Sequence, residues 1–280
     1  MGDNKTSISP LDLIELVGTA RCPRLVDVRR AAAFAEAADL IPTAVWHDHA
    51  TADAWGADLP QEPALVAYCV HGHQVSQSAA ALLRQAGLQA RQLEGGIEAY
   101  REAGGTLVKR VALAGQSDGR PTRWVTRETP KIDRVACPWL IRRFVDRDAA
   151  IHFVESDWVE AAAIELNAIP FDIPGVAFSH EGARCSFDAF IKAFGLEDPA
   201  LRRVARIVRG ADTGRPELAP EAPGLLAVSL GLSAIEGDDL AMMERGFLLY
   251  DALYGWARHA ADESHGWPPA PSPRSEQVSA

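Results

Sequence analysis

The residues most capable of chemistry stand in the segment YCVHGHQVSQ, residues 68–77, between the apolar run ALVAY and the helical run SAAALLRQAG. A loop between a buried strand and the start of a helix gathers backbone N–H groups, and the helix end adds partial positive charge. Both favour the thiolate form of a cysteine at the first loop position, and a thiolate attacks sulfur or carries it as a persulfide. The segment therefore predicts that Cys69 is a nucleophile.

The loop after Cys69 is expected to bind the incoming anion. Gly72 suits a tight turn, because glycine adopts positive φ without steric cost. His71 and His73 could supply hydrogen-bond donors or partial positive charge near neutral pH. The predicted anion-binding loop consists of Val70, His71, Gly72, His73, Gln74 and Val75.

Short apolar runs alternate with helical segments on both sides of this loop. Ser9 and Pro10 are typical of a helix start, and Gly87 is typical of the end of the helix that follows the loop. The alternation predicts an α/β fold, a parallel sheet with helices on both faces. The predicted strands are the runs at 25–28, 43–46, 64–68 and 88–93.

The order of motifs in this region resembles that of a rhodanese domain. The resemblance covers roughly residues 7–108 and rests on LVDVR (25–29), IPTA (41–44), CVHGHQ (69–74) and LEGGI (93–97). It implies a five-stranded parallel sheet and Cys69 as the residue that carries a persulfide between a small-molecule sulfur donor and a thiol acceptor. No cofactor is required for such a transfer. Asp27 and Arg29 are expected to orient the loops near the site rather than to react.

The loop differs from the usual rhodanese pattern at two positions. Many sulfurtransferases of this kind carry arginine at the position of Val70, and arginine or threonine at the position of Gln74. Thiosulfate would therefore meet fewer cations in this loop. The same difference counts against a phosphatase or an arsenate reductase, which need an arginine to hold a tetrahedral oxyanion. An inactive binding module, in which Cys69 is only a buried residue, is the alternative.

Composition divides the chain into two domains. The segment KRVALAGQSDGRPT, residues 109–122, has two glycines, a proline and no sustained periodicity, which predicts a linker. The first domain is then 7–108 and the second is 123–260, while the Pro- and Ser-rich end, 261–280, is predicted to be a disordered tail. The second domain is predicted to be mostly helical (α+β). Its predicted strands are 124–127 and 151–154, and its predicted helices are 139–144, 157–167, 186–194, 198–208, 222–232 and 238–259.

The second domain resembles the C-terminal domain of the chromate resistance protein B (ChrB) family, over about residues 123–259. The segments that carry the resemblance are 124–144, IPGV (173–176), FSH (178–180), RCSFD (184–188) and IVRGAD (207–212). The resemblance implies a link with bacterial chromate resistance, in which family members are described as chromate-responsive regulators. Chromate is thus a candidate ligand, and the resemblance by itself implies no reaction.

Two kinds of site could be built from this domain, and the sequence does not choose between them. A basic set could hold a tetrahedral dianion, or it could be an ion-paired surface: Lys131, Arg134, Arg142, Arg143 and Arg184. A mixed set offers nitrogen, sulfur and oxygen donors for a transition metal, with His180 joined by Cys185 or Asp212: Asp133, His180, Cys185, Asp188 and Asp212. Cys137 is interpreted as a packed thiol, with a redox role toward chromate as the alternative.

Charge and composition exclude several classes of function. The net charge is −10, and residues 120–262 contain 17 Lys and Arg against 22 Asp and Glu, a balance unusual for a dedicated DNA reader. Nucleic acid is therefore not an expected partner. No apolar stretch is long enough for a membrane span, no secretory pattern opens the chain, and four scattered cysteines suggest no disulfides. These features predict a cytoplasmic protein and leave its oligomeric state open.

Two hypotheses follow from the sequence. The first is a rhodanese-type sulfurtransferase fused to a chromate-resistance domain, acting in the response to chromate or oxidative stress. The second is a non-enzymatic regulator that senses chromate or a metal, in which the first domain is a redox or binding module.

Overall fold

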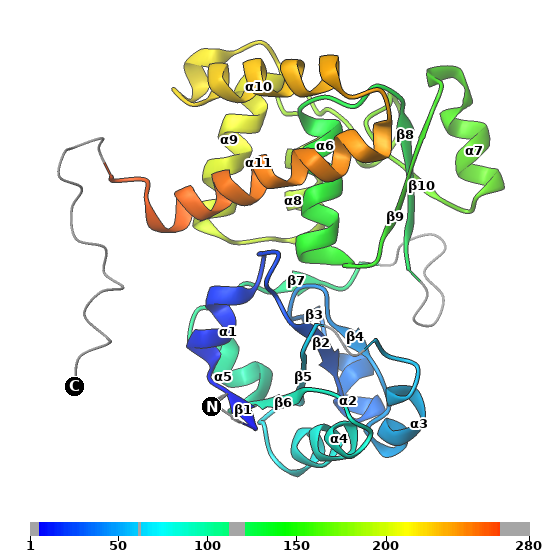
Figure 1. Cartoon of the computed structure of the whole chain (residues 1–280), viewed down its shortest axis with the longest axis vertical. Coiled ribbons are helices and arrows are strands. Elements are labelled where there is room, and N and C mark those ends of the chain that lie inside the picture. The colour runs from blue at the N-terminus through cyan, green and yellow to red at the C-terminus, as the bar shows by residue number, and fades with distance from the viewer. Residues whose placement is uncertain (1–5, 61–62, 112–120, 264–280) are drawn as a thin grey trace.

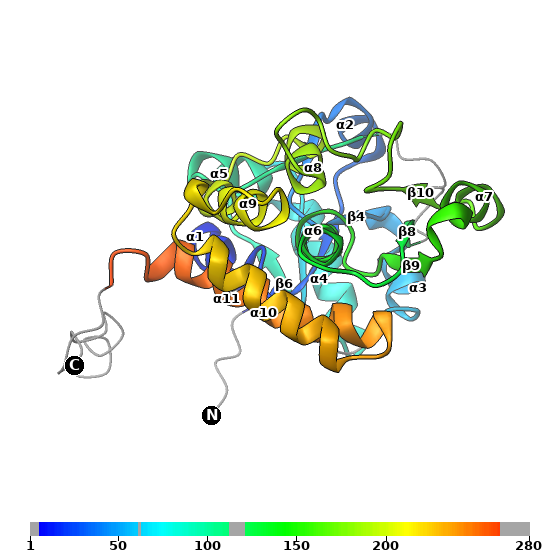
Figure 2. The same cartoon turned by 90° about the horizontal axis from the view of Figure 1, so that it is seen from above.

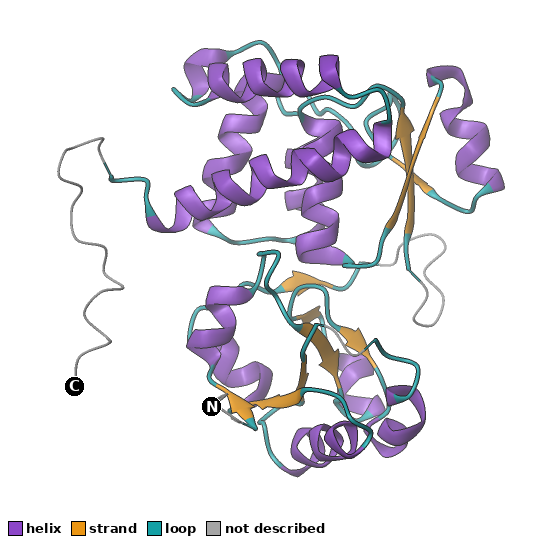
Figure 3. Ribbon diagram, in the orientation of Figure 1, coloured by secondary structure: helices purple, strands orange, loops and turns teal. Residues whose placement is uncertain are grey.

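The computed structural model describes residues 6–60, 63–111 and 121–263. The first domain contains a five-stranded, all-parallel sheet in the order β1-β6-β5-β2-β4 (Figures 1 and 3). This confirms the α/β fold and the five-stranded parallel sheet. The strands are β1 (Ser7–Ile8), β2 (Arg24–Asp27), β4 (Val45–Trp46), β5 (Leu65–Tyr68) and β6 (Ala90–Leu93).

Helices cover both faces of this sheet, as predicted. Successive residues of β5 point to opposite faces: Val66 and Tyr68 pack with α1 and α5, whereas Leu65 and Ala67 pack with α4. The helices are α1 (Pro10–Leu16), α2 (Ala31–Glu36), α3 (Ala52–Gly56), α4 (Gln74–Gln85) and α5 (Gly96–Glu102), with a 3₁₀ turn at His49–Thr51.

The two helix ends read from the sequence have the expected geometry. Ser9 precedes α1, and its Oγ accepts a hydrogen bond from the N–H of Asp12 at 3.1 Å. Gly87, just beyond α4, has φ +88°. The start of α4 differs, because its N-cap residue His73 makes no side-chain cap. The first N–H groups of α4 therefore face the cysteine loop without a side-chain acceptor.

The predicted linker is ordered at both of its ends. Lys109 belongs to β7 (Val108–Lys109), which pairs antiparallel with β3 (Asp39–Leu40). Thr122 donates hydrogen bonds from its N–H and Oγ1 to Asp146 Oδ2, at 2.6 and 2.7 Å. Residues 112–120 of the linker and 264–280 of the predicted tail lie outside the described residues.

The second domain is largely helical and also contains a three-stranded parallel sheet, β10-β8-β9. The strands are β8 (Arg123–Arg127), β9 (Ala150–Val154) and β10 (Ile169–Pro170). Its helices are α6 (Asp133–Leu140), a π-helical turn (Ile141–Val145), a 3₁₀ turn (Ser156–Trp158), α7 (Val159–Glu165), α8 (Ser186–Phe194), α9 (Pro199–Asp212), a 3₁₀ turn (Pro216–Leu218), α10 (Ala222–Ile235) and α11 (Asp239–His259). Seen from above, α10 and α11 lie along one side of this domain (Figure 2). No helix among the described residues is both long and apolar enough to span a bilayer.

The helix predicted at 139–144 in fact begins at Asp133. Pro138 lies inside it, although proline usually marks a helix end. Burial explains the difference, because every residue from Val135 to Leu140 is buried, and all of them except Pro138 belong to the hydrophobic core of the domain. Tertiary packing thus overrides the local signal.

Aromatic side chains form the centre of the second domain. Phe190 of α8 is fully buried, and its ring centroid lies 4.5 Å from that of Phe178 and 5.3 Å from that of Trp124. Phe171 and Phe194 pack on the same ring, at 5.8 and 6.3 Å. These contacts join β8, α8 and the loop after β10, so they position the polar residues described below.

We expect the Phe190→Ala substitution to lower the free energy of unfolding of the second domain by about 3–5 kcal/mol, because it leaves a cavity in this cluster. Leu248→Ala is the matched control, since Leu248 is 72% exposed and should change stability by less than about 0.5 kcal/mol. Urea denaturation followed by tryptophan fluorescence measures both. Equal midpoints for the two variants would contradict this account of the core.

Candidate functional site

Cys69 is the first residue after β5, and four residues separate it from α4. Its side chain is 7% exposed, and Sγ lies 3.2 Å from the Oγ of Ser76, a residue in the first turn of α4. The Ser76 hydroxyl also donates to the His73 carbonyl at 3.2 Å. Sequence reasoning missed Ser76, although its position one turn into the helix after the loop was a usable signal.

Backbone hydrogen bonds from the start of α5 hold the cysteine loop in place. The N–H groups of Ile97 and Glu98 donate to the carbonyls of Cys69 and Val70, at 3.0 and 3.2 Å. Gly72 has φ +66°, as its predicted role in a tight turn requires. A Cβ on Gly72 would lie 2.6 Å from the backbone nitrogen of Gly96, so the contact itself requires glycine.

Asp27 and Arg29 brace the end of β2 beside the cysteine. Asp27 is fully buried and Arg29 is 4% exposed, and Nε and Nη2 of Arg29 both donate to the Asp27 carboxylate. Tyr68, the last residue of β5, donates its hydroxyl to Asp27 Oδ2 at 3.2 Å. Burial raises the pKa of Tyr68 well above its usual value, which keeps this donor protonated. These bonds agree with an orienting role for Asp27 and Arg29.

A pocket of about 600 Å³ opens in front of Cys69. Its lining includes every residue of the predicted loop except Gly72: Cys69, Val70, His71, His73, Gln74 and Val75. Arg29, Arg30 and Ala33 close the other side. Arg30 was missed by sequence reasoning, because it reaches the pocket only through the parallel pairing that places Asp27 opposite Tyr68. The exposed Arg30 adds a cation that the loop itself lacks.

The basic set predicted in the second domain does not converge on one point. Arg134 pairs with Asp172, Arg142 with Glu244 and Arg143 with Asp251, so each of these arginines has an anionic partner. Lys131 is half-buried just before α6. Arg184 lies elsewhere, on the wall of a second pocket.

This second pocket, of about 600 Å³, is formed mainly by α8 and α9 and is strongly basic. Its cationic lining residues are Arg184, Lys192, Arg202, Arg203, Arg206 and Arg209. Asp188 pairs with Arg209, and Lys192 pairs with Glu181 outside the lining. The pocket retains an excess of positive charge and could hold an anion.

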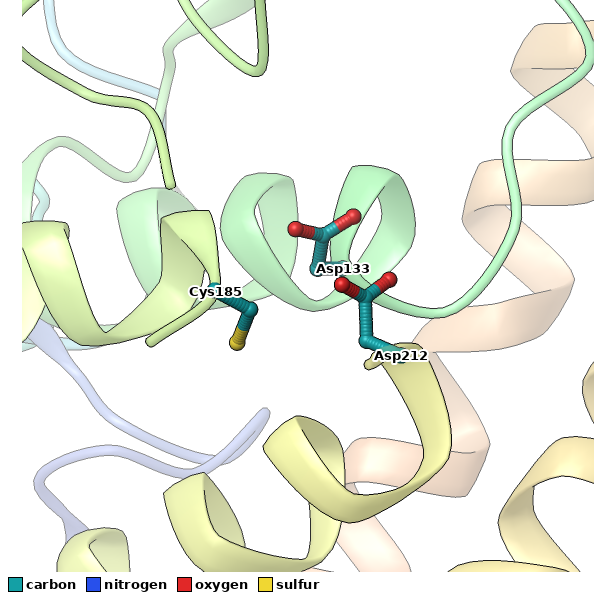
Figure 4. A group of neighbouring side chains, drawn as sticks. All are labelled: Asp133, Cys185 and Asp212. Atoms are coloured by element: carbon teal, nitrogen blue, oxygen red, sulfur yellow. The ribbon is translucent and has the colours of Figure 1, made fainter. Parts of the chain in front are cut away.

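Three of the predicted metal donors, Asp133, His180 and Asp212, lie close together in the structure, and Asp172 joins them. Nε2 of His180 lies 3.3 Å from Asp133 Oδ2, 3.3 Å from Asp212 Oδ2 and 3.5 Å from Asp172 Oδ1. Asp172 follows β10 in a loop, and no sequence signal marked it. The Asp133 and Asp212 carboxylates face one another, with Cys185 beside them (Figure 4).

The thiols and Asp188 occupy the margin of this cluster. Cys185 is the N-cap residue of α8, and its Sγ lies 3.7 Å from Asp188 Oδ2. Cys137 is fully buried in the aromatic core, as a packed thiol would be. Burial raises the pKa of both thiols, so each is held in its protonated form near neutral pH.

Two family models match separate parts of the chain. Residues 9–103 match the model of the rhodanese-like domain, and residues 124–257 match that of ChrB, C-terminal domain. Protein ChrB of Cupriavidus metallidurans is 38% identical over 141 residues, which cover 50% of this chain and 41% of that protein. The chain therefore matches less than half the length of this curated relative.

Solved structures resemble the first domain. A rhodanese-related protein from Thermoplasma volcanium is 25% identical, with a TM-score of 0.32, and the match covers 36% of this chain and 96% of that one. A rhodanese homolog from Thermus thermophilus is 29% identical, with a TM-score of 0.28 and coverage of 33% and 96%. By the match to the two family models, the chain combines a rhodanese-like domain at residues 9–103 with a ChrB C-terminal domain at residues 124–257.

Proposed function

We propose that the first domain is a rhodanese-type sulfurtransferase in which Cys69 carries the persulfide. The observation that supports this most directly is the position of Cys69 in a pocket, at the junction of β5 and the uncapped start of α4. Backbone N–H groups of that helix start stabilise an anion, and Arg30 adds a full positive charge on the opposite wall. A bound dianion is thereby held next to the sulfur.

The reaction proceeds in two balanced steps. The Cys69 thiolate attacks the outer sulfur of thiosulfate, a new S–S bond forms, the S–S bond of thiosulfate breaks, and sulfite leaves with the electron pair. An acceptor thiolate, or cyanide in an assay, then attacks the outer sulfur of the persulfide and regenerates the Cys69 thiolate. No cofactor takes part.

The match of residues 124–257 to the ChrB C-terminal domain supports a link between this chemistry and chromate resistance. We propose that the transferred sulfur supports the response to chromate or to oxidised thiols, in the cytoplasm, with a small-molecule donor and a thiol acceptor. The proposed physiological donor is a sulfane sulfur compound, and the proposed acceptor is a thiol.

We expect Cys69→Ser to abolish the formation of thiocyanate from thiosulfate and cyanide, because serine cannot carry the transferred sulfur. Cys22→Ser is the matched control: burial raises the pKa of Cys22 to about 11, so its thiol stays protonated near neutral pH and should not contribute. Mass spectrometry of the thiosulfate-treated protein should find one added sulfur, on Cys69. Activity that survives in Cys69→Ser, or a wild-type Cys69 that stays unmodified with several donors, would refute the proposal.

We expect Arg30→Gln to reduce kcat/KM for thiosulfate about tenfold, mainly through a higher KM, which corresponds to about 1.4 kcal/mol of lost binding. Arg30 is exposed, so added salt should weaken wild-type binding and narrow the difference between the two proteins. Arg21→Gln serves as the control, because Arg21 is exposed and is not part of the pocket lining. Identical kinetics for Arg30→Gln and wild type would remove Arg30 from the binding site.

A second candidate function, anion sensing, is favoured by the basic pocket of α8 and α9. In this reading the second domain binds a tetrahedral dianion such as chromate, and the first domain is a redox or binding module. Four arginines line this pocket without an ion-pair partner within 4.0 Å among the described residues: Arg184, Arg202, Arg203 and Arg206. They are therefore the side chains best able to receive an anion.

We expect Arg206→Gln to weaken binding of molybdate, which matches chromate in shape and charge, by about tenfold. Isothermal titration of the full chain gives the dissociation constant. Arg245→Gln is the control, because Arg245 is 63% exposed and pairs with Glu236 away from the pocket. No measurable heat with the wild-type protein, or equal affinities for all three proteins, would eliminate this candidate.

A further inference from the structure

Four side chains with metal-binding atoms meet at one point of the second domain, far apart in sequence. Asp133 begins α6, Asp172 follows β10, His180 lies in the next loop, and Asp212 ends α9. His180 is the centre of this group, since its Nε2 approaches a carboxylate of each of the other three.

Only one of the three carboxylates in this group has an arginine or lysine within 4.0 Å among the described residues. Asp172 has its own cations, because Arg127 lies 2.8 Å and Arg134 3.3 Å from its Oδ2. Among the described residues, by contrast, no arginine or lysine lies within 4.0 Å of Asp133 or Asp212, and His180 is their shared partner. Asp133 is 2% exposed and the Asp212 side chain 13%, so water does little to screen them. Two carboxylates with little access to water therefore have one imidazole as their only ionic partner within 4.0 Å among the described residues.

The spacing of the donors is compatible with ligands of one metal ion. Two nitrogen or oxygen ligands that are each about 2.1 Å from a metal lie about 3.0–3.4 Å apart in octahedral or tetrahedral geometry. The Nε2 of His180 lies 3.3 Å from an oxygen of Asp133 and 3.3 Å from an oxygen of Asp212, within this range.

We propose that Asp133, Asp212 and His180 bind a divalent first-row transition-metal ion. One imidazole nitrogen with carboxylate oxygens is a donor set suited to Mn²⁺, Fe²⁺, Co²⁺ or Zn²⁺. The Ser186 N–H donates to Asp133 Oδ2 at 3.3 Å, and the Ser186 hydroxyl donates to Asp172 Oδ1 at 2.8 Å. These bonds orient the carboxylates as outer partners of metal ligands do. The His180 side chain is 43% exposed, so an ion reaches the site from that side.

This site is independent of the chemistry at Cys69, and its test does not use sulfur transfer. The full chain is stripped with EDTA and dialysed against Mn²⁺, Co²⁺ or Zn²⁺ singly, and bound metal is counted by elemental mass spectrometry. We expect one equivalent of at least one metal per chain. We expect His180→Ala and Asp212→Asn to lower the affinity for that metal at least tenfold.

A control removes the other candidate ligands in the first domain. The His71→Ala/His73→Ala double variant should keep the full equivalent of metal, because neither histidine belongs to the cluster. Thermal unfolding gives a second readout: the metal should raise the Tm of the wild type clearly more than that of Asp212→Asn.

Three results would overturn the proposal: no metal retained by the wild type, equal retention by His180→Ala and Asp212→Asn, or loss of the metal in the His71/His73 double variant instead. An equal metal-dependent rise in the Tm of wild type and Asp212→Asn would do the same.

Discussion

A buried ion pair beneath the cysteine loop holds the carboxyl ends of the two central strands together. Asp27 ends β2, Arg29 follows two residues later, Tyr68 ends β5, and all three residues are buried. Buried charges are costly unless they are paired and hydrogen-bonded, so this network tolerates few alternative arrangements. Cys69 comes directly after Tyr68 and takes its position from it.

The same network explains why the pocket has two walls. The loop from Cys69 to His73 forms one wall, while the chain that leaves β2 through Arg29 and Arg30 forms the other. In open parallel sheets such sites lie beyond the carboxyl ends of the strands. The two walls carry positive groups, namely the start of α4 and the Arg30 side chain. These groups belong to segments about 40 residues apart, and the sheet places them on either side of the same pocket.

In the second domain an apolar core places charged groups where water cannot reach them. The rings around Phe190 join β8, α8 and the loop after β10, and the polar ends of these elements meet beside them. Asp133 and Asp172 are buried there at 2% and 4% exposure. Carboxylates at such exposure require nearby positive charge. Arg127 and Arg134 form ion pairs with Asp172, and His180 lies beside Asp133.

Local sequence was sufficient for features that depend on near neighbours. The alternation of apolar runs predicted the parallel sheet, the helix after the loop and its end at Gly87 were visible in the residues, and α8 was predicted with its observed bounds. The position of Cys69 between a strand and a helix was equally local. Such features depend on backbone preferences and on period-2 or period-3.6 burial, both of which a single sequence displays.

Tertiary structure decided which distant residues share a site. The basic residues of 131–143 looked like one anion site, but packing gave the arginines among them separate acidic partners, and Arg184 joined α9 instead. Arg30, Ser76 and Asp172 entered their sites without a sequence motif. Helix α6 continued through Pro138, because burial of its neighbours outweighed the local preference. Contacts between residues far apart in the chain depend on how whole elements pack, and no local pattern encodes that geometry.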